Sequence, residues 1–279
     1  MNAIKTFDEL SRRVTEAGRK PTIAAVNPTD EPSAEALRKI EQSGLAQVVR
    51  IVDSLPKRAA EKAVALIRRG DAQVLMKGFI STDVLLRAVL SKVNSLLPEG
   101  RVLTHLSALE IPSYPKLLYC TDVAVIPYPS QRQRTEQVRY SIGICHRLGI
   151  LQPRVALLHC AEHGGKHFPF VDGYEDIKLL ASQGEFGSCI VDGPLDLKTA
   201  CSLDALHAKG LTSPLQGESD VLVMPDIEAG NAFYKAMTLF TPSRTAGILC
   251  GTICPVVVPS RGDSAEAKLN SIIFALACV

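Results

Sequence analysis

The sequence predicts an α/β fold in which mostly parallel sheets are covered by helices on both faces. Short apolar runs such as Thr22–Val26 (TIAAV) alternate with amphipathic helical stretches such as Lys57–Arg69. This alternation is typical of βαβ units. The helical stretches end at glycines, for example Gly44 and Gly70, which commonly stop helices. A chain of 279 residues is also long enough for two α/β domains.

The first half of the chain predicts a regular series of elements. Phe7, Leu10 and Val14 recur at helical spacing before Gly18, so they predict a first amphipathic helix. The elements expected next are a strand at 22–26, a helix at 35–43, a strand at 46–52, a helix at 57–69, a strand at 74–76, a helix at 83–92 and strands at 102–106, 117–119 and 123–126. The segment 127–130 (PYPS) interrupts this pattern, so we interpret it as a hinge between domains.

The second half repeats the alternation. A helix carrying Arg132, Arg134 and Arg139 follows the hinge. Arg132 and Arg139 are seven residues apart and share one face, whereas Arg134 points elsewhere, and the helix face is interpreted as solvated. The elements expected next are a strand at 155–158, a helix at 174–180, a strand at 188–191, a turn at 192–194, a helix at 199–209, a strand at 221–224, a helix that contains Tyr234 and Lys235, strands at 247–249 and 256–258, and a helix from Ala265.

Composition narrows the class of protein. Hydrophobic residues make up 46% and charged residues 22% of the chain, and its net charge is +2, as in an ordinary globular protein without a basic nucleic-acid-binding face. No apolar run has the length of a membrane span, and MNAIKTFDELSRR lacks the apolar core of a secretory signal. The eight cysteines form no CxxC pair. We therefore expect a cytoplasmic protein whose cysteines are reduced and buried.

Polar turns follow several of the apolar strands, at 77–82 (KGFIST), 192–194 (DGP), 226–231 (DIEAGN) and 260–264 (SRGDS). Because the carboxyl ends of parallel strands meet at one edge of a sheet, these turns predict a shared cleft. Cations and hydroxyls at such an edge fit a phosphate-bearing substrate. The lining would include Lys77, Asp226, Glu228, Lys235, Ser260 and Arg261.

Two of these turns have alternative interpretations. In the first, Gly78 would let the backbone approach a ligand and Ser81 would cap a helix, but Lys77 could equally be a surface lysine. In the last, Arg261 and free helix-start N–H groups would favour an anion. The alternative there is a helix start capped by Asp263 or Ser264, with Arg261 in solvent.

The segment 159–167 (HCAEHGGKH) raises the question of a metal site. His159 and His163 are four residues apart, but Gly164 and Gly165 interrupt any helix, and the segment is not HExxH. We expect loop histidines beside a cleft, with Glu162 facing inward, and no metal. The chain also has no GxGxxG, Walker or GxSxG motif, so hydride transfer on a Rossmann domain, P-loop phosphoryl transfer and α/β-hydrolase chemistry are unsupported.

Six distinctive segments lie between Met76 and the C-terminus: MKGFISTDVLLRAVL, THLSALEIPSYPKLLYCTDVAV, LGILQPRVALLHCAE, VDGPLDLKTA, KGLTSPLQGESDVLVMPDIEAGNAFYK and PVVVPSRGDSAEAK. They resemble the phosphate acetyl/butyryltransferase family, and its butyryl branch more than its acetyl branch. The segments are long and follow the family's order, whereas the first seventy or so residues are less distinctive.

The resemblance implies a fold similar to that of isocitrate and isopropylmalate dehydrogenases, with two α/β lobes and a cleft between them. One lobe would comprise residues 1–128 and 253–279, and the other residues 129–252. The implied reaction is the reversible conversion of acyl-CoA and phosphate into acyl phosphate and CoA, with a short or branched acyl group. CoA and phosphate would be substrates, with no permanently bound cofactor. The resemblance further implies a homodimer that is coupled to an acyl kinase.

The implied chemistry assigns roles to residues. Arg261 would hold phosphate, Ser260 with nearby backbone N–H groups would stabilise the oxyanion, and Lys77 and Lys235 would neutralise substrate charge. A cleft that holds both substrates needs no covalent intermediate, and no cysteine has an obvious base beside it in sequence. The catalytic candidates are Ser260, Arg261, Asp263 and Asp226; the substrate-binding candidates are Lys77, Gly78, Ser81, Thr82, Thr104, His105, Asp122, Arg134, Glu162, Asn231, Lys235, Gly262, Ser264 and Lys268.

The chain departs from the family pattern at two places. The catalytic acid that the acetyl branch carries further along the last helix is absent, so Asp263, Glu266 and Asp226 are all candidates for the base. In the helix after the hinge, Arg134 and Tyr140 replace the usual lysine and asparagine, which leaves the acyl preference open. The alternatives are phosphate acetyltransferase specificity, a metal- or NAD-dependent dehydrogenase of the same fold, and a catalytically silent CoA-binding member.

Overall fold

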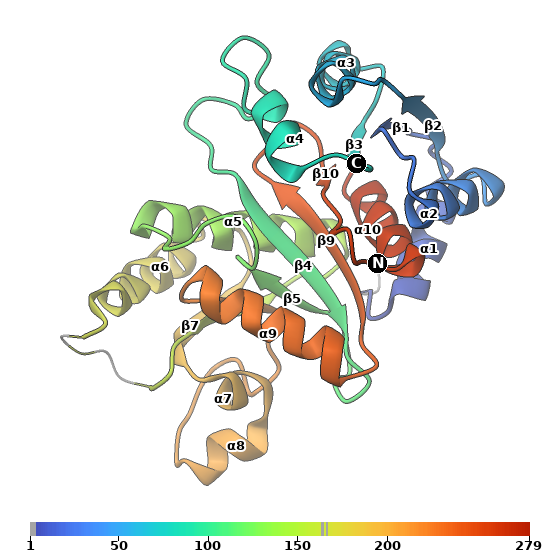
Figure 1. The fold of residues 1–279 in the computed structure, drawn as a ribbon. Helices are drawn as coiled ribbons and strands as arrows, with labels where there is room; N and C mark the ends of the chain where they lie inside the picture. The colour runs from blue at the N-terminus through green and yellow to red at the C-terminus, as the bar shows by residue number, and fades with distance from the viewer. Residues whose placement is uncertain (1–3, 163–164, 166) are drawn as a thin grey trace. The chain divides into compact units, whose positions relative to one another are not determined.

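The computed structural model describes residues 4–162, 165 and 167–279, which form two compact units (Figure 1). The first unit consists of Thr6–Leu103 and Arg244–Val279. The second unit consists of Thr104–Ser243 together with Ile4 and Lys5. The first unit is therefore discontinuous in sequence, and the second contains one long uninterrupted segment.

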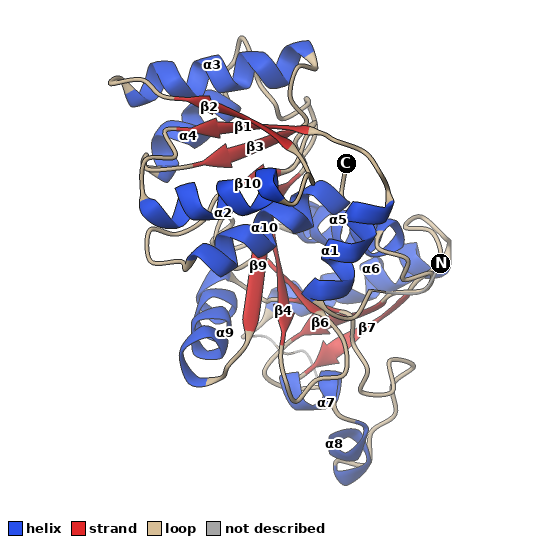
Figure 2. Ribbon diagram, turned by 90° about the vertical axis from the view of Figure 1, so that its right-hand side faces the viewer, coloured by secondary structure: helices blue, strands red, loops and turns tan. Residues whose placement is uncertain are grey.

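The first unit contains five neighbouring strands of sheet, with helices on both faces. Its strand order is β2-β1-β3-β10-β9, and all neighbours are parallel except β10 and β9. Helices α3 and α4 contact each other on one face, and α1, α2 and α10 pack together on the other (Figure 2). The elements are α1 (Phe7–Glu16), β1 (Thr22–Val26), α2 (Glu31–Gln42), β2 (Gln47–Ile51), α3 (Pro56–Arg69), β3 (Val74–Lys77), α4 (Thr82–Val89), β9 (Arg244–Cys250), β10 (Val256–Val257) and α10 (Ala265–Ala277).

The second unit has its own five strands, in the order β4-β5-β8-β6-β7. Only β4 and β5 are antiparallel. The elements are β4 (Thr104–Glu110), β5 (Leu118–Thr121), α5 (Gln131–Arg147), β6 (Arg154–Leu158), a 3₁₀ turn (Pro169–Val171), α6 (Asp172–Ser182), β7 (Ile190–Leu195), α7 (Leu197–Cys201), α8 (Leu203–Ala208), β8 (Val221–Val223) and α9 (Ile227–Phe240).

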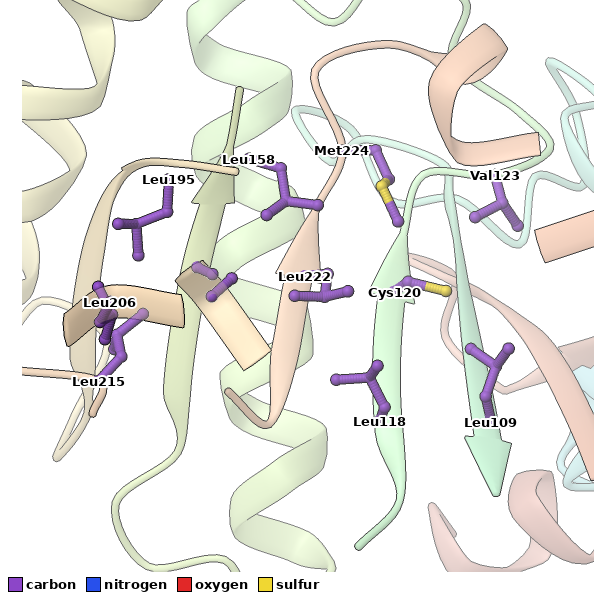
Figure 3. Packing of buried hydrophobic residues seen from close by; sticks show 12 residues of the cluster. Leu109, Leu118, Cys120, Val123, Leu158, Leu195, Leu206, Leu215, Leu222 and Met224 are labelled. Atoms are coloured by element: carbon purple, nitrogen blue, oxygen red, sulfur yellow. The ribbon is translucent and has the colours of Figure 1, made fainter. Parts of the chain in front are cut away.

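One face of the second unit's sheet supports an apolar core. Buried apolar side chains form this core, and Figure 3 shows four of them on three neighbouring strands: Leu118 and Cys120 of β5, Leu222 of β8 and Leu158 of β6. The short helices α7 and α8 add Ala200 and Leu206 to the same cluster. Phe233, Tyr234 and Met237 of α9 pack only partly against it, so much of α9 is left at the surface.

The predicted α/β class and the mostly parallel pairing are confirmed. The compact units do not share the bounds predicted for the lobes, because β5 pairs with β8 and so groups residues 104–128 with the second unit. The lobe division at residues 129 and 253 stays a prediction. No helix in the described part of the chain has both the length and the apolar character to cross a membrane.

Three predicted elements are wrong in detail. Residues 123–126 are not a strand, because their N–H groups turn toward the carboxylate of Asp122 instead of pairing with a neighbouring strand. The predicted turn at 192–194 lies inside β7. There Gly193 passes so close to β6 that a Cβ would lie 2.5 Å from the Leu157 carbonyl oxygen. The predicted helix at 199–209 is two helices, because Ser202 is extended and caps α8 by accepting from the Ala205 N–H at 3.2 Å.

Candidate active site

Two polar turns meet at one edge of the first unit's sheet. β10 runs parallel to β3, so the turn after β3 and the turn after β10 leave the sheet at the same edge. Cζ of Arg261, in the second turn, lies 5.6 Å from the centroid of the Phe79 ring, in the first. The structure therefore brings Lys77–Thr82 and Ser260–Ser264 together, as the strand pattern predicted.

The Ser260 turn is shaped by its own carboxylate. Oδ2 of Asp263 accepts from the Ser260 N–H at 2.7 Å, and the Asp263 N–H donates to the Ser260 carbonyl at 3.3 Å. Ser264 is the N-cap of α10 and accepts from the Ala267 N–H at 3.1 Å. Of the two predicted caps, Ser264 is the one used. Because the Ser260 N–H is engaged by Asp263, any oxyanion must use other donors, such as the Ser260 hydroxyl.

Two buried lysines, Lys77 and Lys268, lie near this turn. Lys77 is 3% exposed, and its Nζ donates to the Gly78 and Ile80 carbonyls at 3.3 and 3.4 Å, so it is not a surface lysine. Burial lowers the pKa of Lys77, and the positive charge of Lys268 lowers it further. Lys268 is also 3% exposed, and it pairs with Asp30 and donates to the Ser33 hydroxyl at 3.0 Å. The structure therefore gives Lys268 an ion pair with Asp30, whereas Lys77 donates to backbone carbonyls.

Asp30 was missed by the sequence interpretation. It caps α2 by accepting from the Ser33 N–H at 3.2 Å, and it also receives Lys268. Burial works to raise the pKa of Asp30, but the hydrogen bonds from Lys268 and Ser33 outweigh it and lower that pKa. Its position in the sequence could have indicated Asp30 as a site residue. Asp30 lies in the polar turn after the strand Thr22–Val26, and turns that follow parallel strands meet at one sheet edge.

Gly78 allows a close approach of backbone to backbone. A Cβ at this residue would lie 2.4 Å from the Asn27 carbonyl oxygen, so only glycine fits. The backbone that Gly78 approaches is thus the end of β1, and the expectation that a ligand also approaches Gly78 stays a prediction. Ser81 caps α4 as predicted, accepting from the Val84 N–H at 3.3 Å, and Thr82 beside it is exposed.

In the second unit, Asp122 is a buried carboxylate whose two oxygens both accept hydrogen bonds from the protein. It is 2% exposed and accepts five hydrogen bonds: from the Thr104 hydroxyl at 2.7 Å and from the N–H groups of His105, Ala124, Val125 and Ile126 at 3.1, 2.7, 2.8 and 3.3 Å. The structure brings together Thr104, His105 and Asp122, and their role in substrate binding stays a prediction. Because its oxygens are already hydrogen-bonded to the protein, Asp122 orders this loop.

Arg134 is buried rather than part of a solvated helix face. It is 1% exposed and donates to the carbonyls of Met224 and Pro225, both at 3.1 Å. The rings of Phe170 and Tyr174 lie 5.2 and 5.4 Å from its Cζ. Burial lowers the pKa of Arg134. Its contacts anchor the segment that leads into α9.

The other predicted residues of the second unit make separate contacts. Asp226 caps α9 by accepting from the Ala229 N–H at 2.8 Å, and the Asn231 amide donates to the Val123 carbonyl at 3.0 Å. Lys235 is exposed on α9. Glu162 pairs with Lys209, and the expectation that it faces a cleft stays a prediction.

A cysteine with an adjacent base does exist. Sγ of Cys160 lies 3.9 Å from Nε2 of His159, whose Nδ1 is 2.7 Å from the Ala161 carbonyl oxygen. Cys160 is exposed and all eight cysteines are free thiols. The expectation that no cysteine has a neighbouring base is therefore wrong, and so is the expectation that all are buried. His163 lies outside the described residues, within which no three His, Cys, Asp or Glu side chains group as for a metal ion.

Comparison with known proteins adds to this geometry. Residues 9–276 match the family model described as "Phosphate acetyl/butaryl transferase". The phosphate butyryltransferase of Clostridium acetobutylicum is 35% identical over 98% of this chain and 97% of its own length. The phosphate acetyltransferase of Thermotoga maritima is 32% identical over 80% of this chain and 76% of its own. The crystal structure of a branched-chain phosphotransacylase from Enterococcus faecalis V583 superposes with a TM-score of 0.81, at 29% identity, over 92% of this chain and 98% of that one. The chain therefore belongs to the phosphate acetyl/butyryl transferase family.

Proposed function

We propose that the protein reversibly transfers a short or branched acyl group between CoA and phosphate. The observation that carries this proposal is Arg261, an exposed arginine in the Ser260 turn beside the buried amine of Lys77. A guanidinium with a hydroxyl and a second cation nearby is suited to bind phosphate. The butyryl and branched-chain relatives support this acyl class over acetyl alone.

The proposed reaction is a direct transfer. A phosphate oxygen attacks the thioester carbonyl carbon, the new C–O bond forms, and the C–S bond breaks to release CoA thiolate, which takes up a proton. Arg261 and Lys77 balance phosphate charge while the Ser260 hydroxyl donates to the carbonyl oxygen as it becomes negative. CoA and phosphate are both substrates, and the proposal includes no permanently bound cofactor.

Three carboxylates were candidates for the base. Glu266 is engaged by Arg244 at 2.9 Å, and Asp226 caps α9. Asp263 shares the turn with Ser260 and Arg261. We therefore infer that Asp263 is the carboxylate of this set that lies in the same turn as the reacting groups, and that its first role is to hold the Ser260 turn.

We also propose the larger organisation that the family implies. Its elements are a fold similar to isocitrate and isopropylmalate dehydrogenases, an interlobe cleft, a cytoplasmic homodimer and an acyl kinase that uses the acyl phosphate. The lobes would comprise residues 1–128 with 253–279, and residues 129–252. The two α/β units support the two-lobed organisation.

One assay tests the proposed function. Free CoA thiol is measured after addition of phosphate to a panel of acyl-CoAs from acetyl to isovaleryl, with a chelator and NAD as controls. We expect phosphate-dependent thiol release that is greatest with a four- or five-carbon acyl group and indifferent to both controls. Preference for acetyl-CoA would indicate acetyltransferase specificity. NAD- or metal-dependent turnover would support a dehydrogenase, and binding of CoA without turnover would support a silent member.

The direct mechanism predicts that Cys160 is dispensable. Although His159 lies beside it, no acyl-cysteine is needed when both substrates are bound together. We expect Cys160→Ala to change kcat/KM by less than about 3-fold, a small effect on the transition-state scale. A loss of 100-fold or more, together with a burst of thiol release in the wild type, would contradict the direct route.

The proposed homodimer predicts an interface that includes the end of α9. Leu239 and Phe240 are 74% and 79% exposed there. Burial of Leu239 from both copies contributes on the order of 4 kcal/mol, so Leu239→Ser should weaken the dimer at least about 100-fold. Analytical ultracentrifugation measures this change. Leu151→Ser is the matched control, since Leu151 is also 74% exposed, and equal weakening by both variants would argue against an α9 interface.

A further inference from the structure

Arg261 has one attractive side-chain contact in the described residues, the ring of Phe79. Its Cζ lies 5.6 Å from the ring centroid. Among residues 4–162, 165 and 167–279, no carboxylate or carbonyl oxygen accepts a hydrogen bond from its guanidinium. Ser260, Arg261 and Gly262 are all exposed, and the space around Gly262 is open. The described part of the turn therefore supplies no hydrogen bond that fixes the arginine side chain.

The backbone around Phe79, unlike the Ser260 turn, is hydrogen-bonded to a neighbouring strand end. The Gly78 N–H donates to the Val26 carbonyl at 2.8 Å, and the Phe79 N–H donates to the Asn27 carbonyl at 2.7 Å. The next residue, Ile80, is 3% exposed and anchors the turn in the core. The Phe79 ring itself is 59% exposed. A large apolar ring is thus held at the surface by a rigid backbone, and Arg261 lies against it.

A ring face suits a phosphate-binding arginine better than a carboxylate would. The ring attracts the cation through its π-electrons and occupies none of its five N–H donors. A carboxylate partner would use those donors and would have to be displaced by phosphate. The ring also holds the guanidinium in a region where Lys77 and Lys268 already place positive charge.

We propose that Phe79 is a positioning residue for phosphate, which orients Arg261 while leaving its N–H donors open. The inference rests on the proposed function only for its kinetic test, because phosphate binding can be measured without turnover. Sequence position alone did not single out Phe79, which appears in KGFIST as one apolar residue in a polar turn.

The kinetic test replaces the ring and then restores it. Loss of an exposed cation–π contact should raise the KM for phosphate in Phe79→Leu roughly 3- to 30-fold. We expect kcat at saturating phosphate and the KM for acyl-CoA to stay within about 2-fold, since this contact acts through one substrate. Phe79→Tyr, which keeps a ring face, should restore the phosphate KM. Leu55→Ala is the control, because Leu55 is 57% exposed in the same unit.

A double-mutant cycle tests whether Phe79 acts through Arg261. In an Arg261→Gln background, Phe79→Leu should no longer change phosphate affinity, since no cation remains to be oriented. Calorimetric titration with inorganic phosphate supplies this affinity without turnover. Equal losses in both backgrounds, an unchanged phosphate affinity in Phe79→Leu, or absence of phosphate binding by the wild type would each overturn the inference. Phosphate binding without acyl transfer would instead reject the proposed function and leave the role of Phe79 testable.

Discussion

Replacement of Asp122 by alanine should lower the free energy of unfolding by on the order of 4 kcal/mol, because several buried donors lose their acceptor at once. The donors are the Thr104 hydroxyl and the N–H groups of His105, Ala124, Val125 and Ile126. Three of them belong to the loop that directly follows β5. Urea unfolding followed by circular dichroism measures the change.

A graded series makes this prediction specific. Asp122→Asn keeps one acceptor oxygen, so its loss should be roughly half that of Asp122→Ala. Asp176→Asn removes an exposed carboxylate from α6 and should change stability by less than about 0.5 kcal/mol. If Asp122→Asn and Asp122→Ala both match the control, the buried carboxylate does not order the loop.

Replacement of Arg261 by alanine should lower kcat/KM for phosphate roughly 100- to 1000-fold, as expected when a charged donor to the reacting group is removed. Most of the loss should appear as a higher KM for phosphate. The effect on kcat should be smaller, since Lys77 and Ser260 stay in place. Steady-state kinetics with varied phosphate at fixed acyl-CoA measures the change. Arg261→Lys should retain part of the activity, because it keeps the charge but loses the bidentate fork.

The control for Arg261→Ala is the same substitution at an arginine outside the proposed site. Arg87 is 79% exposed on α4 and pairs with Asp83, and Arg87→Ala should alter kcat/KM by less than about 2-fold. Wild-type kinetics in Arg261→Ala would remove this arginine from the site and with it the main support for phosphate binding there.

The sequence predicted most of the first unit because local patterns determine most of it. Apolar runs at Thr22–Val26 and Val74–Met76 become parallel strands, and Ser81 caps α4. The meeting of the Lys77 and Ser260 turns followed from the rule that parallel strands end at one edge. This rule does not predict the strand order, and it is the strand order that puts β10 beside β3.

The errors lie where side chains override local pattern. Val123–Ile126 is as apolar as a strand, but the Asp122 carboxylate draws its N–H groups into a turn. Arg134 is charged and sits in a polar stretch, yet carbonyls and two rings enclose it. Lys268 and Asp30 are 238 residues apart in the chain, and no local pattern relates such distant partners.

The discontinuity of the first unit also determines the order in which the chain can fold during synthesis. All five strands of the second unit lie between Thr104 and Val223, so their pairing can be completed while the C-terminal segment is still being translated. The first unit has to wait, because β10 and α10 follow later in the chain. Until then β3 pairs with β1 alone, and Asp30 lacks its lysine. One edge of β3 therefore keeps unpaired backbone groups until β10 is made, and an unpaired strand edge of this kind is open to pairing with another chain.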